Sequence, residues 1–391
     1  MTDRNRHRVS LAEVIVIALL SILGAKALQI WTPSFLAQDP PSVSGPAAEP
    51  DSAPVPSEEE IYRRLYEALA AGEREIVFDF DCADGIFGIY QKVLADHPEL
   101  FWLPGGGSMT KKTSGYETTV FFAPDCPLTD GEIHSRSAEM EERAREILAR
   151  CAESETLWDR LLILHDILAD ECDYDTETAA LLLADSRNAD DAVMQSSSVY
   201  GCLCNRKAVC SGYAAAFQLL ASRLGAECRR VQGTELSAGA PHEWNIVRIG
   251  EDYVHVDVTW DDPIFTGVSE GGHSYDYFCI TTAEIEKTHR IAEPESLPPC
   301  VSEEYGYYRR LGYELEEYGF GEVSDLVARQ LEDGAERIYL KFPDAETAQK
   351  ALDDLLGEKM LFSVPAVKEL GFHSAGGSAS ELGTVCLWLS E

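Results

Sequence analysis

The amino-acid sequence predicts an α+β protein that follows an N-terminal hydrophobic segment and a proline-rich linker. From residue 58 onwards, runs with helical periodicity alternate with short segments that have the alternating pattern of strands. The 391 residues are 45% hydrophobic, which is enough for about one to three domains with sizeable cores. The formal charge of −36, from 32 Lys and Arg against 68 Asp and Glu, would repel phosphate backbones, so we expect no nucleic-acid partner.

Residues 1–31 have the pattern of a targeting or anchoring segment. A basic leader, MTDRNRHR, precedes an apolar stretch from Val14 to Trp31, whose 18 residues would span about 27 Å as a helix. We therefore predict a signal anchor with its basic end in the cytoplasm. Ala25-Lys26-Ala27 also resembles a cleavage site, so a signal peptide cleaved near Ala27 remains open, as does an amphipathic helix of a cytoplasmic protein.

Residues 32–57 contain seven prolines and few bulky apolar side chains, a composition typical of an extended tether. An anchor and a tether would place the remainder of the chain outside the cytoplasm, or secrete it after cleavage, with the membrane contacted by the N-terminal segment alone. The chain has eleven cysteines, which could oxidise in such a compartment.

Residues 58–125 are predicted to form a small α+β unit. Ser57 is a candidate N-cap for a helix that ends at Gly72, and a strand follows over 75–80. A helix over 85–100 and a strand over 115–124 complete the unit. The glycine-rich segment LPGGGSM at 103–109 lacks a phosphate-binding ending and is predicted to be a turn.

Two helices are predicted at the start of a domain that extends over 136–291. They cover 136–151 and 155–170, and the second carries leucines at helical spacing, at positions 157, 161, 164 and 168. That stripe is expected to be core. His165 lies within the same helix, and we expect it to pack or form hydrogen bonds rather than to catalyse.

Residues 301–391 are predicted to form a separate C-terminal α+β domain without an obvious catalytic set. Its predicted strands and helices alternate, over residues 311–318, 323–334, 336–342, 344–357 and 383–389.

Cys210 is predicted to begin a helix that ends near Gly225, because a polar, turn-prone segment precedes it. At a helix N-terminus, free backbone N–H groups and the positive end of the dipole activate a thiol and can stabilise an oxyanion. Gly212 would allow another backbone to approach closely. A buried cysteine on a core helix is the structural alternative.

Residues 241–263 are predicted to contain two strands joined near Gly250. A two-residue turn at either Gly250-Glu251 or Ile249-Gly250 would place His242 and Asp257 on one face, within side-chain reach of each other. A turn of odd length would place them on opposite faces.

A thiol at a helix start, a histidine and a carboxylate are the groups that nucleophilic acyl transfer requires. His255 is a rival base, and Asp261 or Asp262 could replace Asp257 as the group that orients the histidine. Three further side chains are candidates for oxyanion binding or positioning, namely Tyr200, Ser211 and Trp244.

The segment from YGCLCNRKAVCSGYAAAF to HEWNIV and YVHVDVTWDDP resembles the transglutaminase-like superfamily, in its secreted or anchored bacterial branch. The resemblance implies a papain-like core, in which a helix bearing the cysteine packs on an antiparallel sheet bearing histidine and aspartate. It also implies that Cys210 is the nucleophile, His242 the base and Asp257 the orienting carboxylate.

Three residues depart from that family pattern. Glu243 stands between the histidine and the tryptophan, where a second carboxylate could raise the pKa of the base or influence substrate choice. Cys202 and Cys204 precede the nucleophile and could form disulfides or take part in thiol exchange.

The resulting hypothesis is an extracytoplasmic cysteine hydrolase or acyltransferase that acts on peptide or glutamine-type amides of proteins, peptides or cell-wall material. A catalytically silent scaffold or binding module is the alternative. A zinc site is disfavoured because the cysteine spacing is unusual for structural zinc, so no metal or cofactor is expected. Its candidate ligands would be Cys202, Cys204, Cys210, Cys228 and His242.

Overall fold

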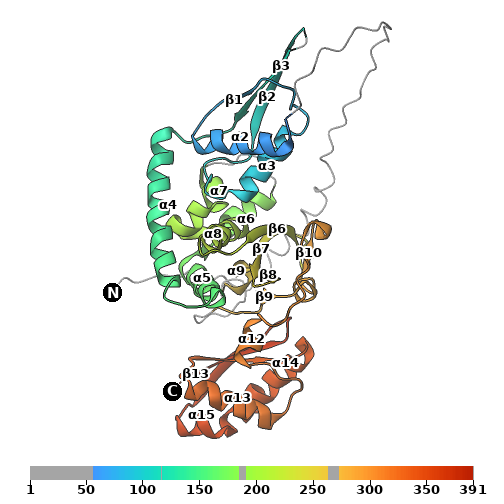
Figure 1. Cartoon of the computed structure of the whole chain (residues 1–391). Helices are drawn as coiled ribbons and strands as arrows, with labels where there is room; N and C mark the ends of the chain where they lie inside the picture. The colour runs from blue at the N-terminus through green and yellow to red at the C-terminus, as the bar shows by residue number, and fades with distance from the viewer. Residues whose placement is uncertain (1–55, 116, 185–190, 263–272, 391) are drawn as a thin grey trace. The chain divides into compact units, whose positions relative to one another are not determined.

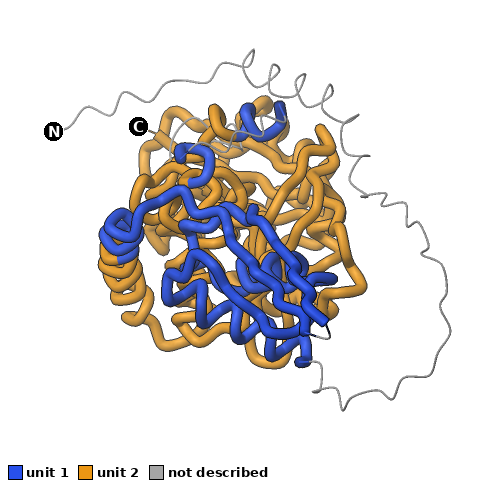
Figure 2. The backbone as a smooth tube through the Cα atoms, turned by 90° about the horizontal axis from the view of Figure 1, so that it is seen from above, with its two compact units in different colours: residues 1–137, 179–194 blue, residues 138–178, 195–391 orange. Residues whose placement is uncertain are grey.

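The computed structural model describes residues 56–115, 117–184, 191–262 and 273–390, which form two compact units (Figures 1 and 2). One unit consists of the described parts of Met1–Ser137 and Ala179–Met194, and the other of Ala138–Thr178 and Gln195–Glu391. The predicted anchor and nearly all of the predicted tether lie outside the described residues. Among the helices that are described, none has both the length and the apolar character needed to cross a membrane.

The first unit contains a three-stranded antiparallel sheet with the strand order β1-β3-β2. The Ser57 hydroxyl accepts a hydrogen bond from the backbone of Glu60 and caps the first helix, as predicted. The prediction of a turn over 103–109 is partly wrong, because its last residues begin β2, a mostly polar strand that pairs along the whole of β3. The elements are α2 (Glu58–Ala70), β1 (Ile76–Phe78), α3 (Ile86–Asp96), β2 (Gly107–Ser114) and β3 (Glu117–Pro124).

Four described helices follow β3 in the chain and precede the segment that carries Cys210. Thr156 caps the second of them, and the predicted stripe is core at Leu161, Leu164 and Leu168, whereas Leu157 is half-buried. The helices are α4 (Asp130–Cys151), α5 (Leu157–Glu171), α6 (Thr176–Leu183) and α7 (Asp191–Ser196).

A five-stranded antiparallel sheet with the order β10-β6-β7-β8-β9 forms the centre of the second unit (Figure 1). Helix α8 (Cys210–Arg223) packs on it, and the Asn245 side chain on β7 donates to the Ala214 carbonyl of that helix at 3.0 Å. This is the predicted α+β, papain-like arrangement of a cysteine-bearing helix on an antiparallel sheet. The strands are β6 (Cys228–Glu235), β7 (Pro241–Ile249), β8 (Asp252–Val256), β9 (Phe278–Ile280) and β10 (His289–Ile291).

Short elements connect the helices to this sheet. A π-helical turn, η1 (Gly201–Asn205), leads to the two-stranded parallel pair of β4 (Asp173–Tyr174) and β5 (Lys207–Ala208). Two one-turn helices, α9 (Val258–Asp261) and α11 (Thr282–Ile285), follow β8 and β9.

The C-terminal segment has its own apolar core around a three-stranded sheet with the order β11-β13-β12. The predicted strand over 311–318 is wrong, because within it Glu314 forms an isolated bridge to Lys341. The domain boundaries drawn from the sequence stay a prediction. The elements are α12 (Tyr307–Leu311), α13 (Phe320–Glu332), β11 (Arg337–Lys341), α14 (Ala345–Leu352), α15 (Pro365–Glu369), β12 (Ser374–Ala379) and β13 (Thr384–Ser390).

Gly233 is the position in the central sheet where an added methyl group should do most harm. Its Cβ would lie 2.2 Å from the Arg290 carbonyl oxygen and 2.7 Å from Cη2 of Trp244. We expect Gly233→Ala to lower the free energy of unfolding by about 1–3 kcal/mol, because the backbone of β10 and the indole must both move. Urea unfolding curves measure this change.

Gly321→Ala is the matched control, because Gly321 lies in α13 and its Cβ would meet nothing within 4 Å. That variant should be unchanged or stabilised by up to about 1 kcal/mol. Equal unfolding midpoints for Gly233→Ala and the parent protein would contradict the steric argument.

Candidate active site

Cys210 is the first residue of α8, as predicted, and its side chain is half-exposed. Val209 is the N-cap residue, with extended backbone and no side-chain cap, and its carbonyl accepts from the N–H of Gly212 at 2.9 Å. The N–H groups of Cys210 and Ser211 therefore remain at the helix start without an intrahelical acceptor. The absence of a side chain at Gly212 lets the backbone of Ser196 pack closely against the start of α8, because a Cβ on Gly212 would lie 2.6 Å from the Ser196 carbonyl oxygen. The helix start therefore supplies a thiol with backbone donors beside it.

His242 and Asp257 are brought together by the hairpin of β7 and β8. Ile249 pairs with Asp252, so the turn consists of Gly250 and Glu251, which is the first of the two predicted registers. Asp257 follows the last residue of β8, and its Oδ2 lies 2.6 Å from Nε2 of His242. Both residues are buried, with 7% and 1% of their surface exposed.

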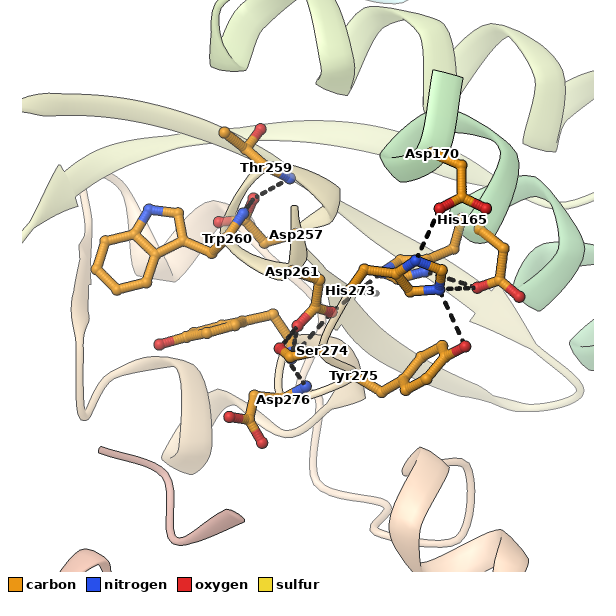
Figure 3. Close-up of polar contacts among 12 residues, drawn as sticks. His165, Asp170, Asp257, Thr259, Trp260, Asp261, His273, Ser274, Tyr275 and Asp276 are labelled. Carbon is orange, nitrogen blue, oxygen red and sulfur yellow. Dashed lines mark hydrogen bonds and ion pairs between the residues drawn. The ribbon is translucent and has the colours of Figure 1, made fainter. Parts of the chain in front are cut away.

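Asp257 also caps helix α9 (Figure 3). Its Oδ1 accepts hydrogen bonds from the backbone N–H groups of Thr259 at 3.1 Å and Trp260 at 3.3 Å. The two carboxylate oxygens thus have separate tasks, since one fixes the backbone after β8 and the other holds the imidazole of His242.

The environment favours the protonated form of His242. Burial lowers its pKa, but the charge and hydrogen bond of Asp257, followed by those of Cys210, outweigh burial and raise the pKa to about 10. Asp257 occupies Nε2, so Nδ1 is the ring nitrogen left for the thiol. For Asp257, burial raises the pKa, but His242 and then His289 outweigh it and hold the pKa well below its usual range.

His255, the rival base, is engaged elsewhere. The Trp244 indole donates to its Nδ1 at 3.0 Å, and its Nε2 lies 3.1 Å from the Thr282 hydroxyl. Burial and the charge of His289 lower the pKa of His255 to about 4, so it remains neutral.

The two alternative orienting carboxylates also have other partners. Asp261 lies 3.1 Å from Nε2 of His165, which is fully buried, and Asp262 accepts a hydrogen bond from the Tyr213 hydroxyl at 2.6 Å. Of the three carboxylates, Asp257 is thus the one that contacts His242.

The three candidates for oxyanion binding or positioning occupy different surroundings. The Tyr200 hydroxyl donates to Glu139 on α4 at 2.6 Å, which commits the proton that an oxyanion would need. Ser211 is half-buried in the first turn of α8. The Trp244 ring stacks on His242 at 5.8 Å between centroids, which suits a positioning residue, since its N–H is used by His255.

The departures from the family pattern lie beside this centre rather than in it. Glu243 forms an ion pair with Arg230 at 3.1 Å, and burial raises its pKa. Cys202 is buried and Cys204 half-buried, and both are free thiols. Burial raises the pKa of Cys204 to about 12 and that of Cys202 well above its usual range, which disfavours thiol exchange.

Two functional-site neighbours were missed from the sequence. The pairing of β4 with β5 places Tyr174 opposite Ala208, and the charges of Cys210 and Asp257 add to burial in raising the pKa of its phenol. His289 begins β10, and its Nε2 lies 3.4 Å from Oδ2 of Asp257. The stretches ILHDILADECDYD and YDYFCITTAEIEKTH, which contain these two residues, are also similar to that family branch, and this similarity was the available signal.

Two groups among the described residues could hold a metal ion, and neither contains cysteine. They are His165 with Asp166 and His273, and His242 with Asp257 and His289. The cysteine-based zinc set considered from the sequence is not among them.

The match to a known family agrees with the resemblance drawn from the sequence. Residues 142–258 match the Transglutaminase-like superfamily. One similar solved structure is a TGase with 15% identity and a TM-score of 0.30, over 51% of this chain and 52% of that one. Another is a candidate cysteine protease from Cytophaga hutchinsonii with 12% identity and a TM-score of 0.25, over 41% of this chain and 65% of that one.

The chain thus spans about half the length of the TGase that it matches. No curated protein matches it.

Replacing Asp257 by asparagine should lower the pKa of His242 well below about 10, because the carboxylate charge is the main group that opposes burial. Asparagine keeps the shape and can still cap α9. The imidazole pKa can be followed by NMR of protein labelled at histidine nitrogens, with Asp262→Asn as the matched control.

The same substitution should change the dependence of stability on pH. A raised histidine pKa stabilises the fold fully below the unfolded value of about 6.5, and this stabilisation is lost as pH rises through about 10. In urea unfolding series at different pH values, we expect the free energy of unfolding of Asp257→Asn to lack the decrease that the parent protein shows between about pH 6.5 and about pH 10. An unchanged pH profile would show that His242 is neutral in the folded protein.

Proposed function

Taking residues 142–258 as a transglutaminase-like domain of the cysteine hydrolase and acyltransferase type, we propose that Cys210 opens peptide or glutamine-type amide bonds through a thioacyl intermediate. The observation that carries this proposal is the 2.6 Å contact between His242 and Asp257 beside a cysteine at a helix start. A scaffold would need none of these three groups in this arrangement.

The first half-reaction forms the thioester. The raised pKa of His242 places the thiol proton on Nδ1 of its ring before the reaction begins, and the resulting Cys210 thiolate adds to the amide carbonyl carbon. The backbone N–H groups of the first turn of α8 are placed to stabilise the resulting oxyanion. When the C–N bond breaks, the imidazolium returns the proton to the leaving amine, and Asp257 stabilises the imidazolium meanwhile.

The second half-reaction releases the acyl group. His242 removes a proton from water or from an amine, and that nucleophile adds to the thioester carbonyl and displaces the Cys210 thiolate, which regains the proton. Water yields a carboxylic acid, and an amine yields a new amide. We propose proteins, peptides and cell-wall peptides as acyl donors.

Cys210→Ala should abolish turnover and leave the fold intact, since the change removes one sulfur atom at a helix start. The assay presents glutamine-containing peptides with and without a biotin-labelled primary amine, and follows ammonia release, peptide cleavage and amine incorporation. Acid-quenched wild-type protein should carry the acyl mass on the Cys210 peptide.

Cys204→Ala is the matched control, because Cys204 is a half-buried thiol outside the centre, and it should retain activity. If the wild-type protein forms no acyl adduct with any donor, the silent scaffold takes precedence. A loss of about 2–5 kcal/mol in Cys210→Ala, as in a core truncation, would also favour a structural role.

We also propose that the folded part lies outside the cytoplasm, on the basis of the apolar run in residues 1–31 and the proline-rich residues 32–57. In a bacterial host, alkaline phosphatase fused after Glu391 should be active and fluorescent protein fused there should be dark. The reverse pair of results would place the domain in the cytoplasm.

A further inference from the structure

A second group of histidine and aspartate side chains joins α5 to residues of the segment before β9 (Figure 3). Nδ1 of His165 lies 3.2 Å from Oδ1 of Asp166, and Nε2 of His273 lies 2.9 Å from the same oxygen. One ligand atom from each of these residues lies within 4.8 Å of the others. Two imidazole nitrogens and a carboxylate oxygen form a donor set that Zn²⁺ and similar divalent ions accept.

The outer nitrogen of each ring faces a further carboxylate. Nε2 of His165 lies 3.1 Å from Asp261 Oδ2, and Nδ1 of His273 lies 3.4 Å from Asp170 Oδ1. Metal-bound histidines commonly have a carboxylate beside one ring nitrogen, which orients the ring N–H and leaves the lone pair of the other nitrogen for the metal. Asp261 contacts His165 through a hydrogen bond, whereas Asp170 contacts His273 as an ion pair without a hydrogen bond. The lone pairs of His165 Nδ1 and His273 Nε2 then both face Oδ1 of Asp166. Because a lone pair repels a carboxylate oxygen, each of these contacts requires a proton or a cation between the two atoms.

Negative charge exceeds positive charge around this point. The side chains of His165 and Asp261 are fully buried, and Asp166 and Asp170 add two more carboxylates. A divalent ion bound between the two ring nitrogens and Asp166 Oδ1 would offset part of this negative charge.

We propose that His165 Nδ1, Asp166 Oδ1 and His273 Nε2 bind one divalent ion of the Zn²⁺ type. The Tyr275 hydroxyl, 3.0 Å from Nε2 of His273, or a water molecule takes a fourth position. The bound ion ties α5 to the chain that follows α9, and it does not depend on the reaction proposed for Cys210.

Metal content and Co²⁺ spectroscopy test the proposal directly. The full chain, purified without chelator, should carry about one equivalent of zinc by elemental analysis. After chelation, Co²⁺ titration should give visible bands of a nitrogen and oxygen site without the near-ultraviolet charge-transfer band of thiolate ligands. Zn²⁺ should also raise the unfolding temperature of the stripped protein.

Three variants locate the ion. Asp170→Asn changes a largely exposed side chain and should weaken binding by about tenfold to a hundredfold, through the outer contact to His273 alone. His273→Asn should weaken it further, because a ligand is lost. His289→Asn is the matched control from the other histidine and aspartate group and should bind like the parent protein.

Several outcomes would overturn the proposal. Absence of binding at about 100 µM free Zn²⁺ would mean that protons alone hold the group together. Binding that is lost in His289→Asn and kept in His273→Asn would move the ion to the Asp257 group, and a thiolate band would move it to cysteines.

Discussion

The carboxylate of Asp257 is the point on which the arrangement of the proposed centre depends. It is buried beside an imidazole, and a buried carboxylate without partners would be strongly unfavourable. Both carboxylate oxygens have partners. Oδ2 contacts the His242 ring, and Oδ1 accepts hydrogen bonds from the first N–H groups of α9. Because α9 fixes the carboxylate, the carboxylate fixes the imidazole, and the imidazole presents Nδ1 to the thiol.

Helix α9 is held at both of its ends by contacts between aspartate and histidine. Asp257 caps its beginning and contacts His242, and Asp261, its last residue, contacts the fully buried His165 on α5. One helical turn therefore connects the two groups of titratable side chains. Buried polar contacts therefore fix both ends of this one-turn helix.

The sequence was informative where local physics decides the structure. The start of α8 at Cys210 follows from turn-prone residues before a strongly helical run. The register of β7 and β8 is one of the two that an even-length turn at Gly250 allows, and the structure selects between them. An even number of turn residues places His242 and Asp257 on one face, so their proximity was predictable.

The sequence was uninformative where distant segments decide the structure. Tyr174 reaches the site through the parallel pairing of β4 with β5, and His289 arrives through the pairing of β10 with β6. The hydrophobic periodicity of the sequence does not predict either of these strand pairings. Strand β12 shows a related limit, because its sequence SAGGSA has low strand propensity, and the reason for a glycine becomes visible only in the fold, where a Cβ on Gly376 would lie 2.5 Å from the Trp388 ring.

The choice between two histidines illustrates how charge assigns chemical roles. His242 and His255 both lie near Asp257, and sequence position alone does not separate their chemistry. Asp257 contacts His242 directly and therefore stabilises the imidazolium form of that ring. The pKa of His242 is raised to about 10 as a result. His255 receives an N–H from Trp244 on its lone pair and loses its proton readily, with a pKa lowered to about 4. Two neighbouring histidines with pKa values this far apart are suited to distinct tasks, His242 to carrying charge beside the thiol as the base that we propose, and His255 to holding the indole in place as a neutral ring.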